Sequence, residues 1–274
     1  MSPTIAPPHP FDTATALIAS GTGTRLGRTT AEYANMVGPF GGITAATLLR
    51  AALEHPDRIG EPVSFTVNFA GPITDGQFEV ETTPVRTSRS TQHWTLALRQ
   101  GGLTNATATA VFGVRRPSWA DDELVAPAVQ PAESVAPQEL PDGIGWFRSY
   151  EMRFVEGGID GMMASSGQAD SKTSHWVRDQ PRRPLDYPAL TALADTFLPR
   201  VMLRLGRIVP AGTVSMTVNF HADADLIAKQ GDRPVLGVAR GHRFVGGFFD
   251  QSAELWGVGG SLLATSHQMV YFKA

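Results

Sequence analysis

The sequence predicts an α+β fold in which two copies of one unit, each a long helix with an antiparallel sheet, join into one continuous sheet. Three observations predict it: a repeated heptapeptide, a second repeated segment farther on, and the same order of helix and strands in both halves. Self-similarity at a nearly fixed distance indicates a duplicated architecture before any single element is assigned.

The repeat is visible in the letters of the chain. Residues 63–69 read VSFTVNF, and residues 214–220 read VSMTVNF, at an offset of 151. A Gly-Gly pair followed three residues later by Ala-Thr occurs at 101–107 and again at 259–265, at an offset of 158. The seven extra residues fit in the glycine-rich stretch between 240 and 250. We therefore expect two copies of one unit.

In the first copy, a helix and a run of strands follow one another. Phe40-Gly41-Gly42 opens a segment with apolar residues at helical spacing, and Pro56 follows its end. Strand-like runs separated by Gly, Pro or Asp lie near 61–72, 76–88, 91–101 and 103–114. The plan is one long helix and an antiparallel meander.

The second copy repeats this plan with two added strands. Its helix is expected from about Pro188 to Leu205, with Asp186 as N-cap and Pro188 in the first turn. Its strands are expected near 146–156, 171–179, 211–223, 233–244, 247–257 and 261–273.

These elements predict three parts of the chain. They are an N-terminal domain (1–114), a linker rich in Pro, Glu, Asp and Ala (115–144), and a C-terminal domain (145–274). A sheet curled round one buried helix is the hotdog arrangement, and it leaves a sheet edge that a second copy can pair with. The predicted fold class is therefore a double hotdog, and whole chains could pair further into a homo-oligomer.

Composition narrows the range of partners. The net charge of -3, without runs of like charge, does not favour nucleic acid or an anionic membrane surface, so a small-molecule partner is expected. The absence of cysteine excludes disulfides and thiolate metal sites and suits a cytoplasmic protein. Met1–Phe11 has no cationic region followed by an apolar one, and the longest apolar stretch (43–53) is interrupted by Arg50. We expect neither a signal peptide nor a membrane span.

Several common sites are not supported by the motifs. The seven histidines contain no i, i+4 pair for a metal, and no Gly-x-Ser-x-Gly occurs for a serine hydrolase, so we expect no metal site. Gly21-Thr22-Gly23 lacks the spacing of a nucleotide loop and predicts a turn.

Three polar residues of the second copy stand out. Asp195 lies on the shoulder of the apolar helix stripe, where partial desolvation would raise the pKa of its carboxyl toward that of a general base; an ordinary solvated aspartate is the alternative. Thr213 is expected on the strand face of Ser215 and Thr217. Gln268 falls in an apolar row with Val270, where a buried amide needs a hydrogen-bond partner.

With these residues the chain resembles the acyl-CoA thioesterase II family. The resemblance is carried by Ala-Asp195 on the helix, by Thr213 eight residues before His221, and by the stretch from Ala264 to Gln268. It implies hydrolysis of an acyl-CoA thioester without a cofactor, with Asp195, Thr213 and Gln268 together holding and activating the water.

Two further groups have open interpretations. Gly41 and Gly42 at a helix start could hold the oxyanion through their backbone N–H groups, or could simply allow close packing against the sheet. Four arginines in related places of the two copies could meet coenzyme A phosphates or could be solvated at sheet edges. These are Arg86, Arg89, Arg240 and Arg243.

Two other functions remain open, a catalytically silent acyl-binding protein and a hotdog enoyl-CoA hydratase. A hydratase would need an Asp–His pair at a loop-helix entry, and no such pair occurs near Phe40 or Asp186. The repeat aligns Thr213 with Pro62 and Gln268 with Ala110, which predicts one working site per chain.

Overall fold

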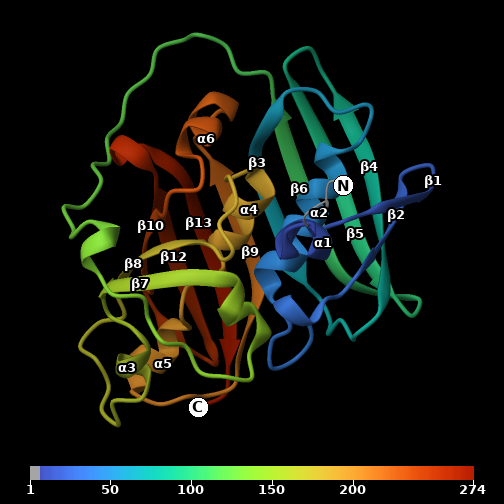
Figure 1. Cartoon of the computed structure of the whole chain (residues 1–274). Helices are drawn as coiled ribbons and strands as arrows, with labels where there is room; N and C mark the ends of the chain where they lie inside the picture. Colours follow the sequence, from blue (N-terminus) through green and yellow to red (C-terminus); the bar gives the residue numbers. More distant parts are fainter. Residues whose placement is uncertain (1–6) are drawn as a thin grey trace, which may run out of the picture.

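The computed structural model describes residues 7–274, and a single sheet of 13 strands organises them (Figure 1). The expectation of no signal peptide concerns Met1–Phe11, and Met1 to Ala6 of that segment lie outside the described residues. The strand order is β1-β2-β4-β5-β6-β3-β9-β13-β12-β10-β8-β7, and β11 pairs with β12.

The strand bounds of the first half are β1 (Ile18–Gly21), β2 (Thr24–Arg28), β3 (Glu61–Phe69), β4 (Gln77–Thr87), β5 (Thr91–Gln100) and β6 (Leu103–Gly113). Those of the second half are β7 (Tyr150–Glu156), β8 (Thr173–Asp179), β9 (Ala211–Phe220), β10 (Val235–Arg240), β11 (Phe244–Val245), β12 (Phe248–Trp256) and β13 (Leu262–Phe272).

The strand register confirms the duplication. β3 places Phe69 opposite Ala106 on β6, and β9 places Phe220 opposite Ala264 on β13, as both sequence offsets require. Each pair also carries a bulge at the same place, with one extra residue in β3 and one in β9. The prediction that the extra residues lie between 240 and 250 is wrong. Val80 pairs with Leu98 and Gly237 pairs with Leu255, so β10 and β12 keep the spacing of β4 and β5. The insertion lies mainly between β9 and β10, in the segment that forms α6 (Ala224–Gln230).

The two halves meet at the antiparallel pair β3 and β9. Thr66 lies opposite Thr217 at the centre of this pair, with 2.9 Å between their hydroxyl oxygens. Ser64 Oγ donates to Asn219 Oδ1 at 3.0 Å beside them. Because Thr66 and Thr217 are equivalent in the repeat, a pseudo-twofold axis passes between them. The α+β double hotdog with one continuous sheet is therefore confirmed.

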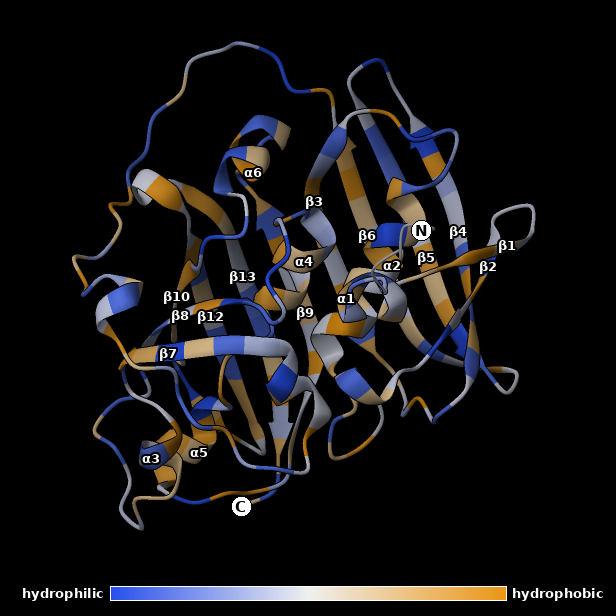
Figure 2. Ribbon diagram, in the orientation of Figure 1, coloured by the Kyte–Doolittle hydropathy of each residue, from blue (hydrophilic) through white to orange (hydrophobic). Residues whose placement is uncertain are grey.

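Two helices fill the concave side of the sheet. α2 (Gly41–Leu53) and α4 (Tyr187–Leu193) pack against each other there (Figure 1). Apolar residues dominate both helices and the strand segments around them (Figure 2). Leu48 and Leu49 of α2 are completely buried, which favours folding by roughly 2 kcal/mol for each side chain.

The predicted helix from Pro188 to Leu205 is wrong in extent. Two helices, α4 and α5 (Arg200–Leu205), are separated by residues 194–199, so Asp195 lies in a turn instead of within a helix. Pro199 has no N–H to donate and disfavours the helical conformation of Leu198, which accounts for the break. The start is as predicted, because Asp186 accepts from the Ala189 N–H at 2.8 Å.

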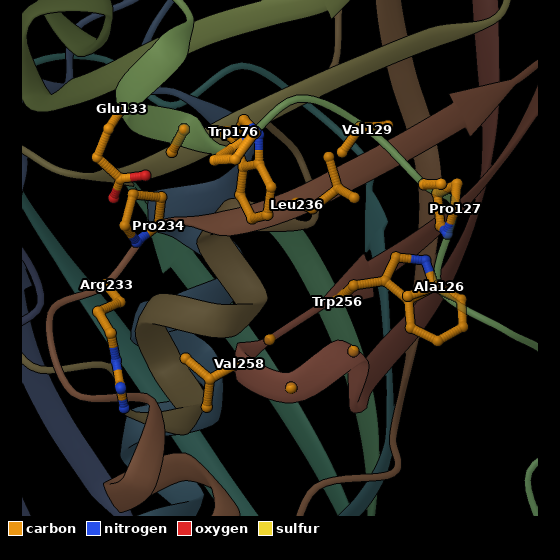
Figure 3. Close-up of a pocket in the computed structure, with 16 residues that line it drawn as sticks. Ala126, Pro127, Val129, Glu133, Trp176, Arg233, Pro234, Leu236, Trp256 and Val258 are labelled. Carbon is orange, nitrogen blue, oxygen red and sulfur yellow. The ribbon is translucent and has the colours of Figure 1, made fainter.

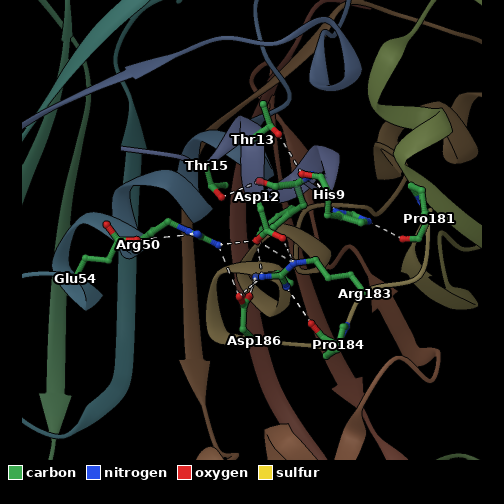
Figure 4. Close-up of polar contacts among 12 residues, drawn as sticks. His9, Asp12, Thr13, Thr15, Arg50, Glu54, Pro181, Arg183, Pro184 and Asp186 are labelled. Atoms are coloured by element: carbon green, nitrogen blue, oxygen red, sulfur yellow. Dashed lines mark hydrogen bonds and ion pairs between the residues drawn. The ribbon is translucent and has the colours of Figure 1, made fainter. Parts of the chain in front are cut away.

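Ion pairs tie the N-terminal segment to both helices (Figure 4). Arg183 donates to Asp12 at 2.8 Å and to Asp186 at 2.5 Å, and Arg50 of α2 donates to the same Asp12 at 3.3 Å. Asp12 belongs to α1 (Pro10–Ala14). This network fixes the start of α4 beside the last turn of α2.

Several elements have no counterpart in the sequence prediction. They are α1, the hairpin of β1 and β2, α3 (Ile159–Met162) and α6 (Ala224–Gln230). The predicted turn at Gly21-Thr22-Gly23 is confirmed as the turn of that hairpin. Residues 115–144 contain only a 3-10 turn, Ala132–Ser134, and part of this segment packs on β10 and β12. The domain bounds 1–114 and 145–274 stay a prediction.

Candidate active site

Asp195, Thr213 and Gln268 are brought together although they lie far apart in the sequence. Gln268 Nε2 donates to Asp195 Oδ1 at 2.9 Å, and Thr213 Oγ1 donates to Gln268 Oε1 at 3.1 Å. The three side chains thus form one hydrogen-bonded row from the turn after α4 to β13 and β9.

Gln268 is the centre of this row and is 3 % exposed. Its Nε2 also donates to the Ala194 carbonyl at 3.2 Å, so both amide ends are engaged. A buried amide with partners at both ends cannot turn without losing hydrogen bonds, which costs about 1–3 kcal/mol for each group left unpaired. Gln268 therefore holds the Asp195 carboxylate in one orientation.

Thr213 reaches Gln268 because of the bulge in β9. Ser215 pairs with Met269 and Thr213 pairs with Val270, so Val214 is an extra residue without a partner. A bulge reverses the alternation of side chains along a strand. The expectation that Thr213 shares a face with Ser215 and Thr217 is wrong, because Thr213 points to the concave side with Gln268.

Burial changes the protonation of Asp195. It raises the pKa of the Asp195 carboxyl to about 7, against smaller lowering effects from the Gln268 hydrogen bond and the Gly42 backbone N–H. A carboxyl with a pKa near 7 is ionised about half the time at neutral pH and accepts a proton more readily than an ordinary aspartate. Of the two interpretations of this residue, the desolvated carboxyl fits better than an ordinary solvated aspartate, and its role as a general base stays a prediction.

The start of α2 lies against the same carboxylate. A Cβ atom on Gly41 would lie 2.7 Å from Asp195 Oδ2, which is closer than an alanine could fit without displacing it. A Cβ atom on Gly42 would lie 2.7 Å from the Ala192 carbonyl oxygen. The first N–H groups of a helix have no acceptor within the helix. The candidate site thus combines a helix start of the first half with a base of the second.

A contact of Gln268 with Met216 escaped the sequence prediction. Met216 Sδ lies 3.5 Å from Gln268 Nε2, and the two residues are opposite one another in the β9–β13 pair. The equivalent pair in the first half is Phe65 and Ala110. The signal was present, because Met216 is the only position at which the two repeated heptapeptides differ.

Other features of the chain lie away from this row. A cavity of about 430 Å³ lies between residues 126–133 and the outer side of β8, β10 and β12, lined by Trp176 and Trp256 (Figure 3). Arg240 is on that outer side as well, and pairs with Glu254 at 3.5 Å.

Within residues 7–274 no group of three His, Asp or Glu side chains is arranged to hold a metal ion. None of the helices described is long and apolar enough to cross a membrane.

Comparison with models of protein families shows which family this chain belongs to. The family model of the acyl-CoA thioesterase C-terminal domain matches residues 122–272, and that of the N-terminal domain matches residues 22–113. The chain belongs to the acyl-CoA thioesterase family. It is therefore a thioester hydrolase. No functionally curated protein matches this thioesterase in sequence.

Solved structures agree with this assignment. A hotdog-fold protein of unknown function from Alicyclobacillus acidocaldarius is 50 % identical, with a TM-score of 0.92 over 97 % of this chain and 99 % of that one. A tesB protein of Mycobacterium avium subspecies paratuberculosis is 19 % identical, with a TM-score of 0.78 over 96 % of this chain and 98 % of that one. The acyl-CoA thioesterase II TesB2 of Mycobacterium marinum is 16 % identical, with a TM-score of 0.74 over 96 % and 98 %. The last two show the fold alone.

Proposed function

We propose that this thioesterase hydrolyses acyl-CoA thioesters, with a fatty acyl group, through water activated by Asp195. The observation that carries the proposal is the hydrogen-bonded row of Asp195, Gln268 and Thr213 beside the start of α2. The apolar concave side favours a fatty acyl chain over a polar acyl group.

The reaction uses only groups of this chain, the substrate and water. The Asp195 carboxylate accepts a proton as the water oxygen bonds to the thioester carbonyl carbon. Gln268 holds the carboxylate, and Thr213 keeps oxygen lone pairs free to accept from the water. The carbonyl oxygen becomes an oxyanion, which the N–H group of Gly41 stabilises, whereas the Gly42 N–H donates to the Asp195 carboxylate. When the carbon–sulfur bond breaks, the coenzyme A sulfur takes the proton back from Asp195.

Asp195→Asn provides the decisive test. The amide has nearly the same shape and keeps an oxygen to accept from Gln268, but it cannot take a proton from water. We expect hydrolysis to fall by about a hundredfold or more, with binding of a non-hydrolysable acyl-CoA thioether retained. Release of the coenzyme A thiol from a panel of acyl-CoAs measures the rate. Asp75→Asn, an exposed position, is the matched control and should leave the rate unchanged.

Thr213→Ala and Gln268→Ala test the remainder of the row. Both should lower kcat more than they change KM, because the two residues are proposed to orient water and base instead of substrate. A rise in KM alone would make them binding residues. Lack of thiol release by the unmodified chain from every acyl-CoA would favour the silent acyl-binding protein.

A further inference from the structure

A second cluster of reactive side chains lies on the outer side of the sheet, behind Gln268. Ser252 of β12 is opposite His267 on β13, whereas the next residue pair, Gln251 and Gln268, faces the concave side. Neighbouring residues of a strand point to opposite faces. The outer cluster is therefore separated from Asp195 by the thickness of the sheet.

In this cluster a histidine lies between a serine and an aspartate and contacts both. His242 Nδ1 lies 2.5 Å from Asp250 Oδ2, and His242 Nε2 lies 3.4 Å from Ser252 Oγ. The histidine stands in the connection between β10 and β12, and the other two residues are on β12. A nucleophile, a base in reach of it and a third group that orients the base are what nucleophilic catalysis requires.

Asp250 is held in the ionised state that this role needs. Its Oδ1 accepts from the backbone N–H groups of His242 at 3.2 Å and Arg243 at 2.9 Å. Partial burial raises the pKa of the Asp250 carboxyl, but these bonds and His242 outweigh it and lower the pKa to about 2. With Nδ1–H donating to a carboxylate, the neutral ring of His242 presents a lone pair at Nε2 to the Ser252 hydroxyl.

A cation is placed for the oxyanion. Arg240 of β10 lies directly opposite Ser252 across the strand pair, and its side chain is 56 % exposed. The N–H groups of β12 take part in strand pairing on both sides. The donor for a developing negative charge is therefore the Arg240 guanidinium, which has to leave Glu254, its partner at 3.5 Å. Ser252 is partly exposed, so a small molecule in solution can reach it.

We propose that Ser252, His242 and Asp250 form a second nucleophilic site that accepts the acyl group of small activated esters. Ser252 Oγ bonds to the ester carbonyl carbon while His242 Nε2 takes the hydroxyl proton. The ester carbon–oxygen bond breaks, and His242 passes the proton to the departing alcohol. Water then attacks the acyl-serine, with His242 again accepting a proton and returning it to Ser252.

A fluorophosphonate probe tests the serine directly, because it modifies serines activated by a base. We expect one modification per full-length chain, located at Ser252 by peptide mass mapping, and the same modification in Asp195→Asn. His242→Gln can still hydrogen-bond to Asp250 but cannot accept the proton, and should slow modification at least about tenfold. Ser64→Ala is the matched control: Ser64 is a partly buried serine on the same outer side, with asparagine as its partner.

Turnover distinguishes this site from the thioesterase site. Hydrolysis of p-nitrophenyl acetate should persist in Asp195→Asn and fall to background in Ser252→Ala, whereas Ser252→Ala should hydrolyse acyl-CoA normally. If His242→Gln melts at a much lower temperature, Asp250→Asn replaces it, with the same expected loss. Absence of label at Ser252, or equal labelling rates with and without His242, would overturn the proposal and leave the cluster as an anchor for the β10–β12 connection.

Discussion

At the scale of single residues, the fold places the Asp195 carboxylate where its ionised form is disfavoured. Gln268 supplies one strong hydrogen bond, but burial is the larger effect on the pKa of the Asp195 carboxyl. When it is ionised, a buried carboxylate destabilises the folded chain. The same burial raises its affinity for a proton, which is the property that a general base needs. Both consequences depend on pH and can be measured.

The hydrolysis rate should follow ionisation of Asp195. Since the base is active when deprotonated and its pKa lies near 7, kcat/KM should rise with pH and reach half of its maximum near pH 7. Stability should change in the opposite direction. The carboxyl pKa is higher in the folded chain than its ordinary value of 3.8, so the folded chain binds the proton more tightly and loses stability as pH rises from about 4 to about 7.

Asp195→Asn separates these two effects. At pH 8 this variant should melt at a higher temperature than the unmodified chain. Its free energy of unfolding should be higher by about 2 kcal/mol, a value that allows for partial access of solvent to the carboxyl. Near pH 4 the two melting temperatures should converge. An equal difference at both values of pH would show that Asp195 is not the titrating group.

Sequence reasoning singled out three residues that the structure brings together, but it misplaced two of them, Asp195 within a helix and Thr213 on the outer face. Period-two alternation put Thr213 on the outer face, and an unseen bulge at Val214 turns it inward. A bulge depends on how two strands pair, and a single strand carries no local record of that. By contrast, a comparison of the two repeats is able to predict the contact of Met216 with Gln268. In the first half the equivalent residues are Phe65 and Ala110, so a larger side chain on one strand accompanies a smaller one on its partner.

At the scale of elements, the proposed active site depends on how α2 meets the turn after α4. Pro199 ends the helical path and gives Asp195 a place facing the first turn of α2. The apolar periodicity from Leu190 to Val201 was read as one helix because both pieces keep a buried stripe. The proline was the local signal against it.

Gly41→Ala should test this approach of α2 to Asp195. The new Cβ atom would lie 2.7 Å from Asp195 Oδ2, and a carboxylate at the end of a side chain moves more easily than a helix. We expect a loss of hydrolysis of at least about tenfold with little change in melting temperature, because displacement of a reacting group is costly to the rate. Gly71→Ala is the control, since its Cβ atom would have only an ordinary contact at 3.9 Å. Normal activity of Gly41→Ala would show that the close approach is not needed.

At the scale of the whole molecule, the repeat explains why the chain folds as a unit. β3 and β9 occupy the centre of the sheet, and each would become an unpaired edge if the halves were separated. The helices α2 and α4 would lose each other at the same time. The duplication was the part of the architecture easiest to predict, whereas α1 and the β1–β2 hairpin belong to no repeated motif and were missed.

Separated halves should therefore fail to fold alone. Residues 1–120, expressed without the remainder, should show no cooperative melting transition and should aggregate, because they expose β3 and one face of α2. Co-expression with residues 121–274 should restore a soluble complex with a cooperative transition. A soluble, cooperatively melting fragment of residues 1–120 would contradict this dependence.

The same pseudo-symmetry predicts the number of working sites. The places equivalent to Thr213 and Gln268 hold Pro62 and Ala110, which stand in the same register on β3 and β6 but have no side-chain group to orient water. Where the working site has glycines at the start of α2, α4 begins with Tyr187, whose hydroxyl donates to the Ala222 carbonyl at 3.1 Å. We therefore predict one working site per chain.

Titration with a non-hydrolysable acyl-CoA thioether should saturate at one equivalent per chain, and Asp195→Asn should leave no second-site turnover. If that variant kept about half of the activity with an unchanged KM, the groove of the first half would be active, and the loss of its polar residues would have to be compensated by groups outside the repeat.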